Sequence, residues 1–286
     1  MKIFCTFSFF EYFCIKIHTL MLKFISFGSG SSGNCYYLFT ENDGILIDAG
    51  VGVSILKKWF ADYGLSMSNI HNILITHHHA DHVKCVGSLS NDLKVPVYAT
   101  RQVHVGIDNN YCVRYKVNGA NRKYIEKGST FSIGDFRITT FEIPHDCDNV
   151  GFMLEHKGIT FCLMTDVGHV TEEMKTFISR ANYLVIEANH EDEMLKAGPY
   201  PEFLKERVAG ENGHLSNRMC AIALAENVTE KLKHVWLCHI SDVNNDPVLA
   251  RKTVEIILGS YGIVAGKDFM LEVLKRKTPS NLFDLI

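Results

Sequence analysis

Residues 71–82 place a short apolar run, HNILIT, directly before HHHADH, which holds four histidines and an aspartate. The apolar run predicts a buried strand, and a loop at the end of a buried strand is held rigid. Imidazole and carboxylate side chains are ligands that suit Zn, Mn and Fe. Alternate side chains of an extended loop point the same way, so His77 and His79 are predicted to converge while His78 points elsewhere.

The second half of this segment predicts a further metal position. Asp81 and His82 follow the small Ala80, and a turn there would aim both side chains beside the first position. Such a histidine tract is also compatible with a solvated loop that scavenges metal without a defined site. The preceding strand and the H-x-H-x-D-H spacing favour a built metal site.

Apolar runs typical of strands occur in both halves of the chain, with helical patterns between them. Strands are predicted at 23–27, 35–40, 44–50, 71–76, 95–100, 136–143, 150–156, 159–166, 183–188 and 234–240, and helices at 53–64, 171–180, over much of 191–228 and at 247–262. This order predicts an α/β (α+β) fold in which two sheets pack face to face under covering helices. The pattern alone also allows a doubly wound sheet.

The composition sets limits on partners and compartment. A net charge of −3 gives no general attraction to nucleic acid or acidic membranes, so binding a polyanion would need a local basic patch. Nine cysteines, an odd number without a C-x-x-C pair, indicate reduced thiols in a cytosolic protein. We expect no membrane association and no obligate protein partner.

The first twenty residues are apolar and aromatic, which raises the question of a secretory leader. Glu11, Lys16 and His18 interrupt this stretch, and no small-residue cleavage site follows it. Met21 begins a segment that continues directly into a predicted strand. We therefore expect an extension at 1–20, upstream of the natural start, and a single domain over 21–286, although a true leader is the alternative.

Three further apolar runs end in metal-binding residue types: His145 in EIPHD, Asp166 in LMTDVG and His239 in LCHIS. Together with H-x-H-x-D-H and with Asp48 in LIDAG, these motifs resemble those of the metallo-β-lactamase superfamily over residues 22–265. The resemblance implies a four-layer αββα sandwich, two divalent metal ions (Mn or Zn), and a supporting role for Asp48. The implied ligands are His77, His79, His145 and Asp166 for one metal, and Asp81, His82, Asp166 and His239 for the other.

The motif details favour one branch of this superfamily. The third motif is Pro144-His145-Asp146, whereas glyoxalase II and many lactonases carry Gly-His-Thr there. GHLSN at 213–217 resembles the His-Ser motif of the phosphodiesterase branch, which implies that His214 is catalytic. GHLSN is also compatible with a helix start capped by a polar side chain. Asp81 is expected to act in catalysis as well as in metal binding.

Longer stretches resemble the YycJ/WalJ-type proteins, bacterial members related to a DNA exonuclease activity that acts from 5′ ends. They include FGSGSSGNCYYL, PHDCDNVGF, IEANHEDEML and LCHISDVNND. Asp166 and His239 are 73 positions apart, which leaves no room for a β-CASP insertion. Substrate contacts are expected at Ser216, Asn217, Asn189 and His190.

The sequence thus predicts a cytoplasmic, dinuclear metal-dependent hydrolase, a phosphodiesterase or nuclease acting on DNA as a 5′-exonuclease. Two alternatives remain at this point. One is a metallohydrolase of small molecules, such as a cyclic phosphodiester, a lactone or a thioester. The other is a non-catalytic regulatory protein on the same fold, because a fold alone does not define a function.

Overall fold

The computed structural model of the protein describes residues 21–286, and the predicted extension at 1–20 lies outside the described residues. The described chain forms two seven-stranded sheets. The first contains, in spatial order, β14 (Phe283–Leu285), β1 (Leu22–Gly28), β2 (Cys35–Phe39), β3 (Gly44–Ile47), β4 (Asn72–Leu74), β5 (Val97–Ala99) and β6 (Arg122–Tyr124). The second contains β13 (Met270–Val273), β12 (His234–Cys238), β11 (Tyr183–Glu187), β10 (Ile159–Met164), β9 (Val150–His156), β8 (Phe136–Glu142) and β7 (Thr130–Ile133).

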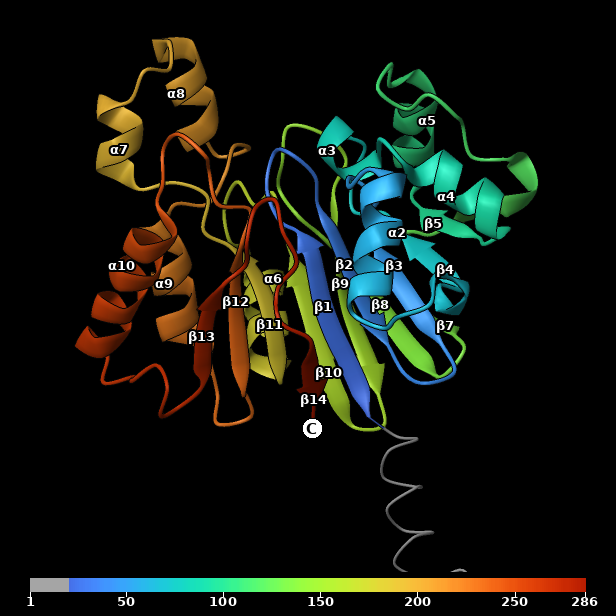
Figure 1. Ribbon diagram of the computed structural model, residues 1–286. Helices are drawn as coiled ribbons and strands as arrows, with labels where there is room; N and C mark the ends of the chain where they lie inside the picture. The colour runs from blue at the N-terminus through green and yellow to red at the C-terminus, as the bar shows by residue number, and fades with distance from the viewer. Residues whose placement is uncertain (1–20) are drawn as a thin grey trace, which may run out of the picture.

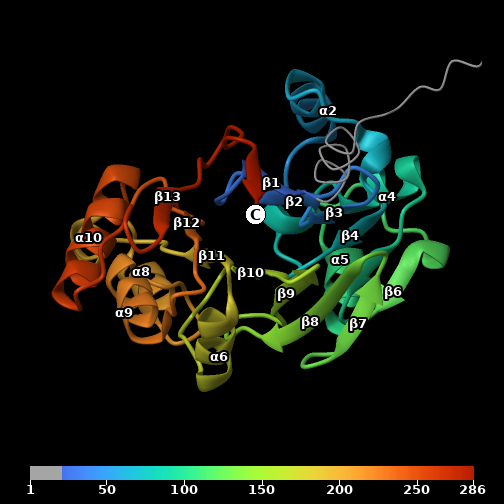
Figure 2. The same ribbon diagram turned by 90° about the horizontal axis from the view of Figure 1, so that it is seen from below.

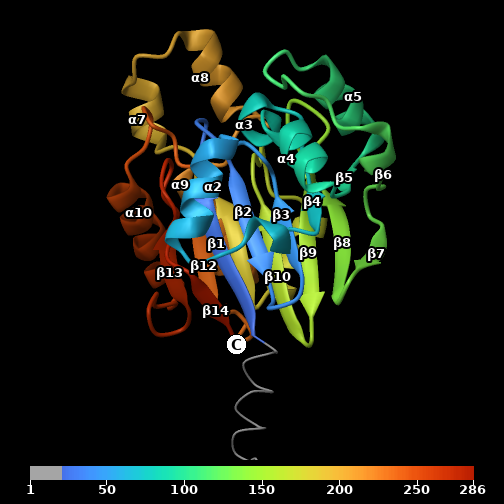
Figure 3. The same cartoon turned by 45° about the vertical axis from the view of Figure 1, so that its right-hand side comes forward.

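Helices cover the outer faces of both sheets (Figures 1 and 2). One outer side carries α2 (Val53–Asp62), α4 (Val86–Leu93) and α5 (Arg101–Asn109), and the other carries α6 (Glu172–Arg180), α9 (Asn217–Asn227) and α10 (Pro247–Ser260). Figures 1 and 3 show α3 (Ala80–Val83), α7 (Asp192–Ala197) and α8 (Glu202–Ala209) at one end of the molecule. The predicted four-layer αββα sandwich is confirmed.

Three buried hydrophobic clusters hold these layers together. One lies between the two sheets, where the rings of Phe24 and Phe161 have centroids 4.9 Å apart and those of Phe24 and Trp236 4.7 Å apart. The other two lie between each sheet and its helices. Because both faces of each sheet are covered, the central strands read as continuous apolar runs rather than alternating ones.

The parallel strands of each sheet bring distant segments to one edge. Strands β3 to β6 are parallel neighbours in the first sheet, and β10 to β13 are parallel neighbours in the second. The carboxyl ends of parallel strands meet at the same edge of a sheet, where ligand-binding loops gather. Asp48 follows β3, Asp166 follows β10 and His239 follows β12 within two residues of the strand end.

The predicted elements agree with the structure best where the apolar run is long. Residues 101–127 give little core signal, yet α5 forms there with Thr100 accepting a hydrogen bond from the Val103 amide. Val103 and Ile107 are buried one helical turn apart, and polar residues around them obscure the period. The short strands β6, β7, β13 and β14 were likewise not predicted, because three or four residues carry little pattern. Within residues 21–286, none of the helices has the length and apolar character that a bilayer crossing requires.

Candidate metal and catalytic site

Three residues next to the strand ends have backbone conformations that non-glycine residues rarely adopt. Asp48, Asp166 and His239 have φ values of 60°, 56° and 53°. Left-handed backbone at such residues costs about 1–3 kcal/mol each and is retained where the fold imposes it, often at functional sites. Each of these residues turns the chain sharply after its strand, so that its side chain faces the same region.

One group of ligand atoms comes from three histidines. His77, His79, His145 and Cys147 offer ligand atoms that all lie within 4.8 Å of one another. The Nε2 atoms of His77 and His145 are buried and make no hydrogen bond. Their Nδ1 atoms lie 3.0 Å from Thr76 Oγ1 and 3.1 Å from the Gly213 carbonyl oxygen. Imidazoles held through one nitrogen, with the other buried and without a hydrogen bond, fit a metal ion.

The second group lies beside the first. Asp81, His82 and His239 bring their ligand atoms within 4.8 Å of one another, as do His77, His82 and Asp166. His82 Nε2 lies 3.2 Å from Asp166 Oδ2, and His239 Nε2 lies 3.4 Å from Asp81 Oδ2. Asp166 therefore lies between the two groups, and the structure brings all seven predicted ligand residues together.

Cys147 is the fourth member of the first group and was not among the predicted ligands. Burial raises the pKa of its thiol to about 12, and nearby Asp146 and Asp166 add to this. A thiol with such a pKa stays protonated near neutral pH, and the thiolate is the form that binds metal. The three histidines are thus the stronger donors.

Asp48 supports His82 from behind. Both side chains are fully buried, and Asp48 Oδ2 lies 2.7 Å from His82 Nδ1. The same carboxylate accepts hydrogen bonds from the Thr76 amide and hydroxyl. This contact fixes the imidazole so that Nε2 faces Asp166, which is the usual role of a carboxylate behind a metal-binding histidine. Gly50 is needed for a close approach nearby, because a Cβ there would lie 1.6 Å from the Asp81 carbonyl oxygen.

Glu187 is a central residue that the sequence interpretation missed. Its side chain is fully buried at the end of β11, and Oε1 lies 2.9 Å from His214 Nδ1 and 2.8 Å from His239 Nδ1. Oε2 accepts hydrogen bonds from the amides of Val167 and Leu215. The sequence did contain a signal for this residue: YLVIE is an apolar strand that ends in a carboxylate. A buried carboxylate needs a hydrogen-bonding or charged partner.

Glu187 and His214 stabilise each other's charged forms. Burial alone would raise the pKa of Glu187, but His214 and His239 lower it to about 2. Burial alone would lower the pKa of His214, but the Glu187 carboxylate raises it above its usual value. Glu187 is therefore ionised, and the His214 imidazole is stabilised in its protonated form.

A hollow of about 310 Å³ opens on these groups. It is lined by Ser31, His79, Asp81, Asp146, Asp166, Tyr200, Leu204, Arg207, Val208, Gly213, His214 and His239. Asp146 Oδ1 lies 3.2 Å from His79 Nε2 and 3.3 Å from His145 Nε2, and Arg207 Nε donates to Asp146 Oδ2 at 3.0 Å. Asp146 therefore lies between the imidazoles of His79 and His145 on one side and the guanidinium group of Arg207, on α8, on the other.

None of the four predicted substrate contacts lines this hollow. Ser216 caps α9 by accepting a hydrogen bond from the Met219 amide, and Asn217 is buried with its side chain donating to Glu191. Asn189 donates to the His239 carbonyl oxygen at 2.9 Å. His190 lines a separate hollow under α7 and α8. Contact of these four residues with substrate stays a prediction.

The loop from Gly28 to Asn34 also reaches the ligand groups. Asn34 Nδ2 lies 3.1 Å from Asp81 Oδ2 and 2.8 Å from His82 Nε2. The same side chain closes its own loop, because its Oδ1 accepts from the Gly30 amide at 2.8 Å. The glycine- and serine-rich turn therefore holds an amide against the candidate metal ligands.

Comparison with known proteins assigns the class. Residues 44–240 match the family described as Beta-lactamase superfamily domain. The crystal structure of the metallo-β-lactamase fold protein YhfI from Bacillus subtilis has the same fold, with a TM-score of 0.68 at 14% identity over 92% of this chain and 99% of that one. The chain therefore belongs to the metallo-β-lactamase superfamily, as its motifs predicted.

Two relatives show which proteins of this superfamily the chain resembles in sequence. The chain is 32% identical over 262 residues to Exodeoxyribonuclease YycJ of Bacillus anthracis, a match that covers 91% of this chain and 98% of the relative. It is 33% identical over 250 residues to Exodeoxyribonuclease WalJ of Streptococcus pneumoniae, covering 86% of this chain and 92% of the relative. The predicted similarity to YycJ/WalJ-type proteins is confirmed.

Proposed function

We propose that this protein is a divalent-metal-dependent exodeoxyribonuclease of the 5′ type that acts in the cytoplasm. The observation that carries the proposal is the position of His214, an imidazole outside the seven implied ligands, held by a buried carboxylate in the hollow that also contains Asp81, Asp166 and His239. The names of the YycJ and WalJ relatives support a DNA substrate.

The proposed metal ligands are the seven residues that resemblance predicted: His77, His79, Asp81, His82, His145, Asp166 and His239. Their nitrogen and oxygen donor atoms suit Zn or Mn, and the buried Nε2 atoms of His77 and His145 make no hydrogen bond. Two divalent ions would supply Lewis-acid chemistry at this site, acidifying water and neutralising phosphate charge. Two carboxylates in the set leave a net positive charge with two divalent ions, which suits an anionic diester.

Individual side chains of the protein have separate roles in the proposed hydrolysis. His214 Nδ1 is engaged by Glu187, so Nε2 is the nitrogen available to the substrate. In the proposed reaction the attacking water releases one proton to bulk solvent, its oxygen forms a bond to phosphorus, and the bond from phosphorus to the ester oxygen breaks. His214 donates its proton to that departing oxygen as general acid.

Two further side chains position the reactants. The pKa of Asp81 is lowered to about 2, because His82 and His239 outweigh the effect of burial. Asp81 is therefore an ionised acceptor that can orient the attacking water. Arg207 extends from α8 toward Asp146 and lies on the wall of the hollow, where its guanidinium can contact a phosphate oxygen.

The direct test is digestion of end-labelled oligonucleotides. Single- and double-stranded DNA and RNA, labelled at either end, are incubated with the protein in Mn²⁺, Zn²⁺ or Mg²⁺. The proposal expects mononucleotides released successively from the 5′ end of DNA with Mn²⁺ or Zn²⁺. Hydrolysis of bis-p-nitrophenyl phosphate without degradation of any oligonucleotide would instead indicate a small-molecule phosphodiesterase.

A further inference from the structure

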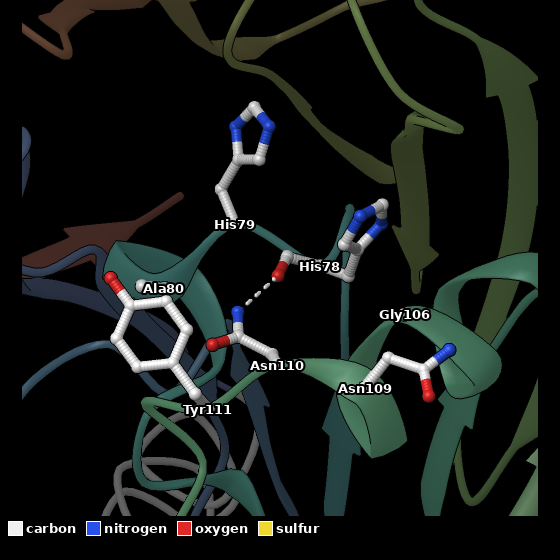
Figure 4. Close-up of a pocket in the computed structure, with 7 residues that line it drawn as sticks. All are labelled: His78, His79, Ala80, Gly106, Asn109, Asn110 and Tyr111. Atoms are coloured by element: carbon white, nitrogen blue, oxygen red, sulfur yellow. Dashed lines mark hydrogen bonds between the residues drawn. The ribbon is translucent and has the colours of Figure 1, made fainter.

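A second hollow, of about 450 Å³, shares His79 with the catalytic hollow, and Figure 4 shows the residues that line it. It is lined by His78, His79 and Ala80 from the ligand loop and by Gly106, Asn109, Asn110 and Tyr111 from the end of α5 and the residues after it. His79 lines both this hollow and the one that contains His214. Since His79 is also one of the candidate metal ligands, the second hollow begins beside the ligand group.

The chemistry of the lining differs sharply from that of the catalytic hollow. The catalytic hollow contains Asp81, Asp146, Asp166 and Arg207, whereas no Asp, Glu, Lys or Arg lines the second one. The second hollow offers the phenol ring of Tyr111, the imidazoles of His78 and His79, and two carboxamides instead. An uncharged, polar and aromatic lining does not suit a phosphate, but it suits a nucleobase, which stacks on rings and hydrogen-bonds to amides.

Tyr111 provides the accessible ring. Its side chain is 95% exposed, which leaves its ring free for contact with a ligand. Figure 4 shows the Tyr111 ring beside Ala80, with Asn109 on the other side of Asn110 near Gly106. Asn109 is also exposed. A carboxamide can pair with a base edge through one donor and one acceptor at once.

The floor of the hollow is held in place by specific contacts. Asn110 Nδ2 donates to the His78 carbonyl oxygen at 2.8 Å, and Asn110 Oδ1 accepts from the Cys112 amide at 2.9 Å. A Cβ at Gly106 would lie 2.2 Å from His78 Cγ, so the His78 ring packs directly on the backbone of α5. These contacts fix the end of α5 and the backbone on either side of Tyr111 relative to the ligand loop, which reduces the backbone part of the ordering cost of binding.

We propose that this hollow is a nucleobase subsite, which binds the base of the 5′-terminal nucleotide, next to the scissile diester at the metal ligands. The subsite rests on the proposed nuclease function and specifies it, since it requires a substrate with an aromatic base next to the scissile diester. His78, which does not point at the metal ligands, then forms part of the substrate-binding floor. Tyr111 stacks on the base, and Asn109 contacts its edge.

The experiment compares two single-stranded DNA substrates that differ only in whether the 5′-terminal nucleotide carries a base. The subsite predicts that the wild-type protein has a lower KM for the natural end than for the abasic end. Tyr111→Ala should raise KM for the natural substrate about 10-fold, as expected for loss of one stacking contact, and should leave KM for the abasic substrate near its wild-type value. Tyr111→Phe, which keeps the ring, should behave as wild type.

Control variants and a second readout separate the possible failures. Tyr261 is 51% exposed at the end of α10, so Tyr261→Ala should change neither KM. Asn109→Ala should also reduce the preference for the natural end. Binding of the same two DNAs, made resistant to cleavage by phosphorothioate linkages, is measured by fluorescence anisotropy with the metal-loaded protein.

Each outcome decides between the two proposals. Equal effects of Tyr111→Ala on natural and abasic DNA, in both KM and affinity, would overturn the subsite while leaving the nuclease function intact. Base-dependent binding that Tyr111→Ala abolishes, in a protein that cleaves no DNA, would uphold the subsite and refute the nuclease function. Absence of both cleavage and base-dependent binding would refute both.

Discussion

Oε1 of Glu187 lies 2.9 Å from Nδ1 of His214; Glu187 is fully buried, whereas His214 is partly exposed on the wall of the catalytic hollow. The same oxygen lies 2.8 Å from Nδ1 of His239, a candidate metal ligand. One carboxylate oxygen therefore links the proposed general acid to the proposed metal centre. This arrangement makes the protonation of His214 depend on Glu187, and that dependence can be measured.

Replacing Glu187 by Gln should lower kcat on DNA about 10–100-fold, the usual cost of losing a carboxylate behind a functional histidine. Glu187 raises the pKa of His214, so the variant should also lose activity at lower pH on the alkaline side of its kcat profile. The measurement is kcat against pH, with metal content determined in parallel. Glu142→Gln, at the exposed end of β8, is the matched control. An unchanged alkaline limb would contradict the role of Glu187.

His214→Ala should lower kcat on DNA by roughly 10²–10⁴-fold, the range for a positioned general acid, and should leave metal content unchanged. The loss should be smaller on bis-p-nitrophenyl phosphate, because p-nitrophenolate needs little protonation as it departs. Steady-state kinetics on both substrates gives the comparison. Equal losses of kcat on the two substrates would indicate that His214 positions the phosphate rather than donating a proton. Full activity on both would indicate that GHLSN only begins helix α9 and has no catalytic role.

The sequence predicted that the seven candidate ligands lie close together, because each of them follows a strand-like apolar run or belongs to the H-x-H-x-D-H loop. Parallel strand ends gather at one edge, so order along the chain translated into proximity. Glu187 escaped prediction because it is the last residue of a buried strand rather than the first of a loop. Its partners His214 and His239 lie 27 and 52 positions away, and only the fold brings them together.

The predicted substrate contacts stay predictions, because the sequence did not show which side chains line the catalytic hollow. Ser216 and Asn217 stand next to His214 in sequence, yet α9 begins there and turns both side chains to structural roles. Tyr111 and Asn109 lie in a segment without a recognisable core pattern, and α5 carries them to the ligand loop. Which side of a loop faces the site depends on tertiary packing, which residue spacing does not encode.

Asp48→Ala should weaken metal binding about 10–100-fold, because the imidazole of His82 would lose the group that orients it. It should also destabilise the metal-free protein by about 3–5 kcal/mol, since a buried charged partner is left alone. Metal titration and urea unfolding test the two effects. Asp62→Ala removes an exposed carboxylate that pairs with Lys58, and it should cost less than about 1 kcal/mol. Equal effects of the two variants would contradict the supporting role of Asp48.

Two adjacent histidines offer a matched test of the ligand assignment. His79→Ala should reduce the metal content of the loaded protein, because Nε2 of His79 faces the candidate ligand group. His78→Ala should leave metal content unchanged, because its ring packs on α5. Elemental analysis after metal loading and gel filtration distinguishes the two, with about two equivalents expected for the wild type. Loss of metal from the His78 variant would mean that the ligand loop has a different register.

Metal binding should be coupled to proton release, with opposite effects of pH on the metal-free and metal-loaded proteins. Burial would lower the pKa of His82, but Asp166, Asp48 and Asp81 together raise it to about 10 in the metal-free protein. A histidine whose pKa is raised from about 6.5 stabilises the fold below pH 6.5, and this contribution is lost as the pH rises toward 10. The melting temperature of the metal-free protein should therefore fall over that interval.

A metal ion binds the neutral form of imidazole, so the gain in melting temperature on adding Zn²⁺ or Mn²⁺ should grow between pH 6.5 and 8. Calorimetry in buffers of different ionisation enthalpy counts the protons released. A metal-free protein whose stability is flat from pH 6.5 to 10, together with no proton release on loading, would show that His82 is neutral before metal arrives.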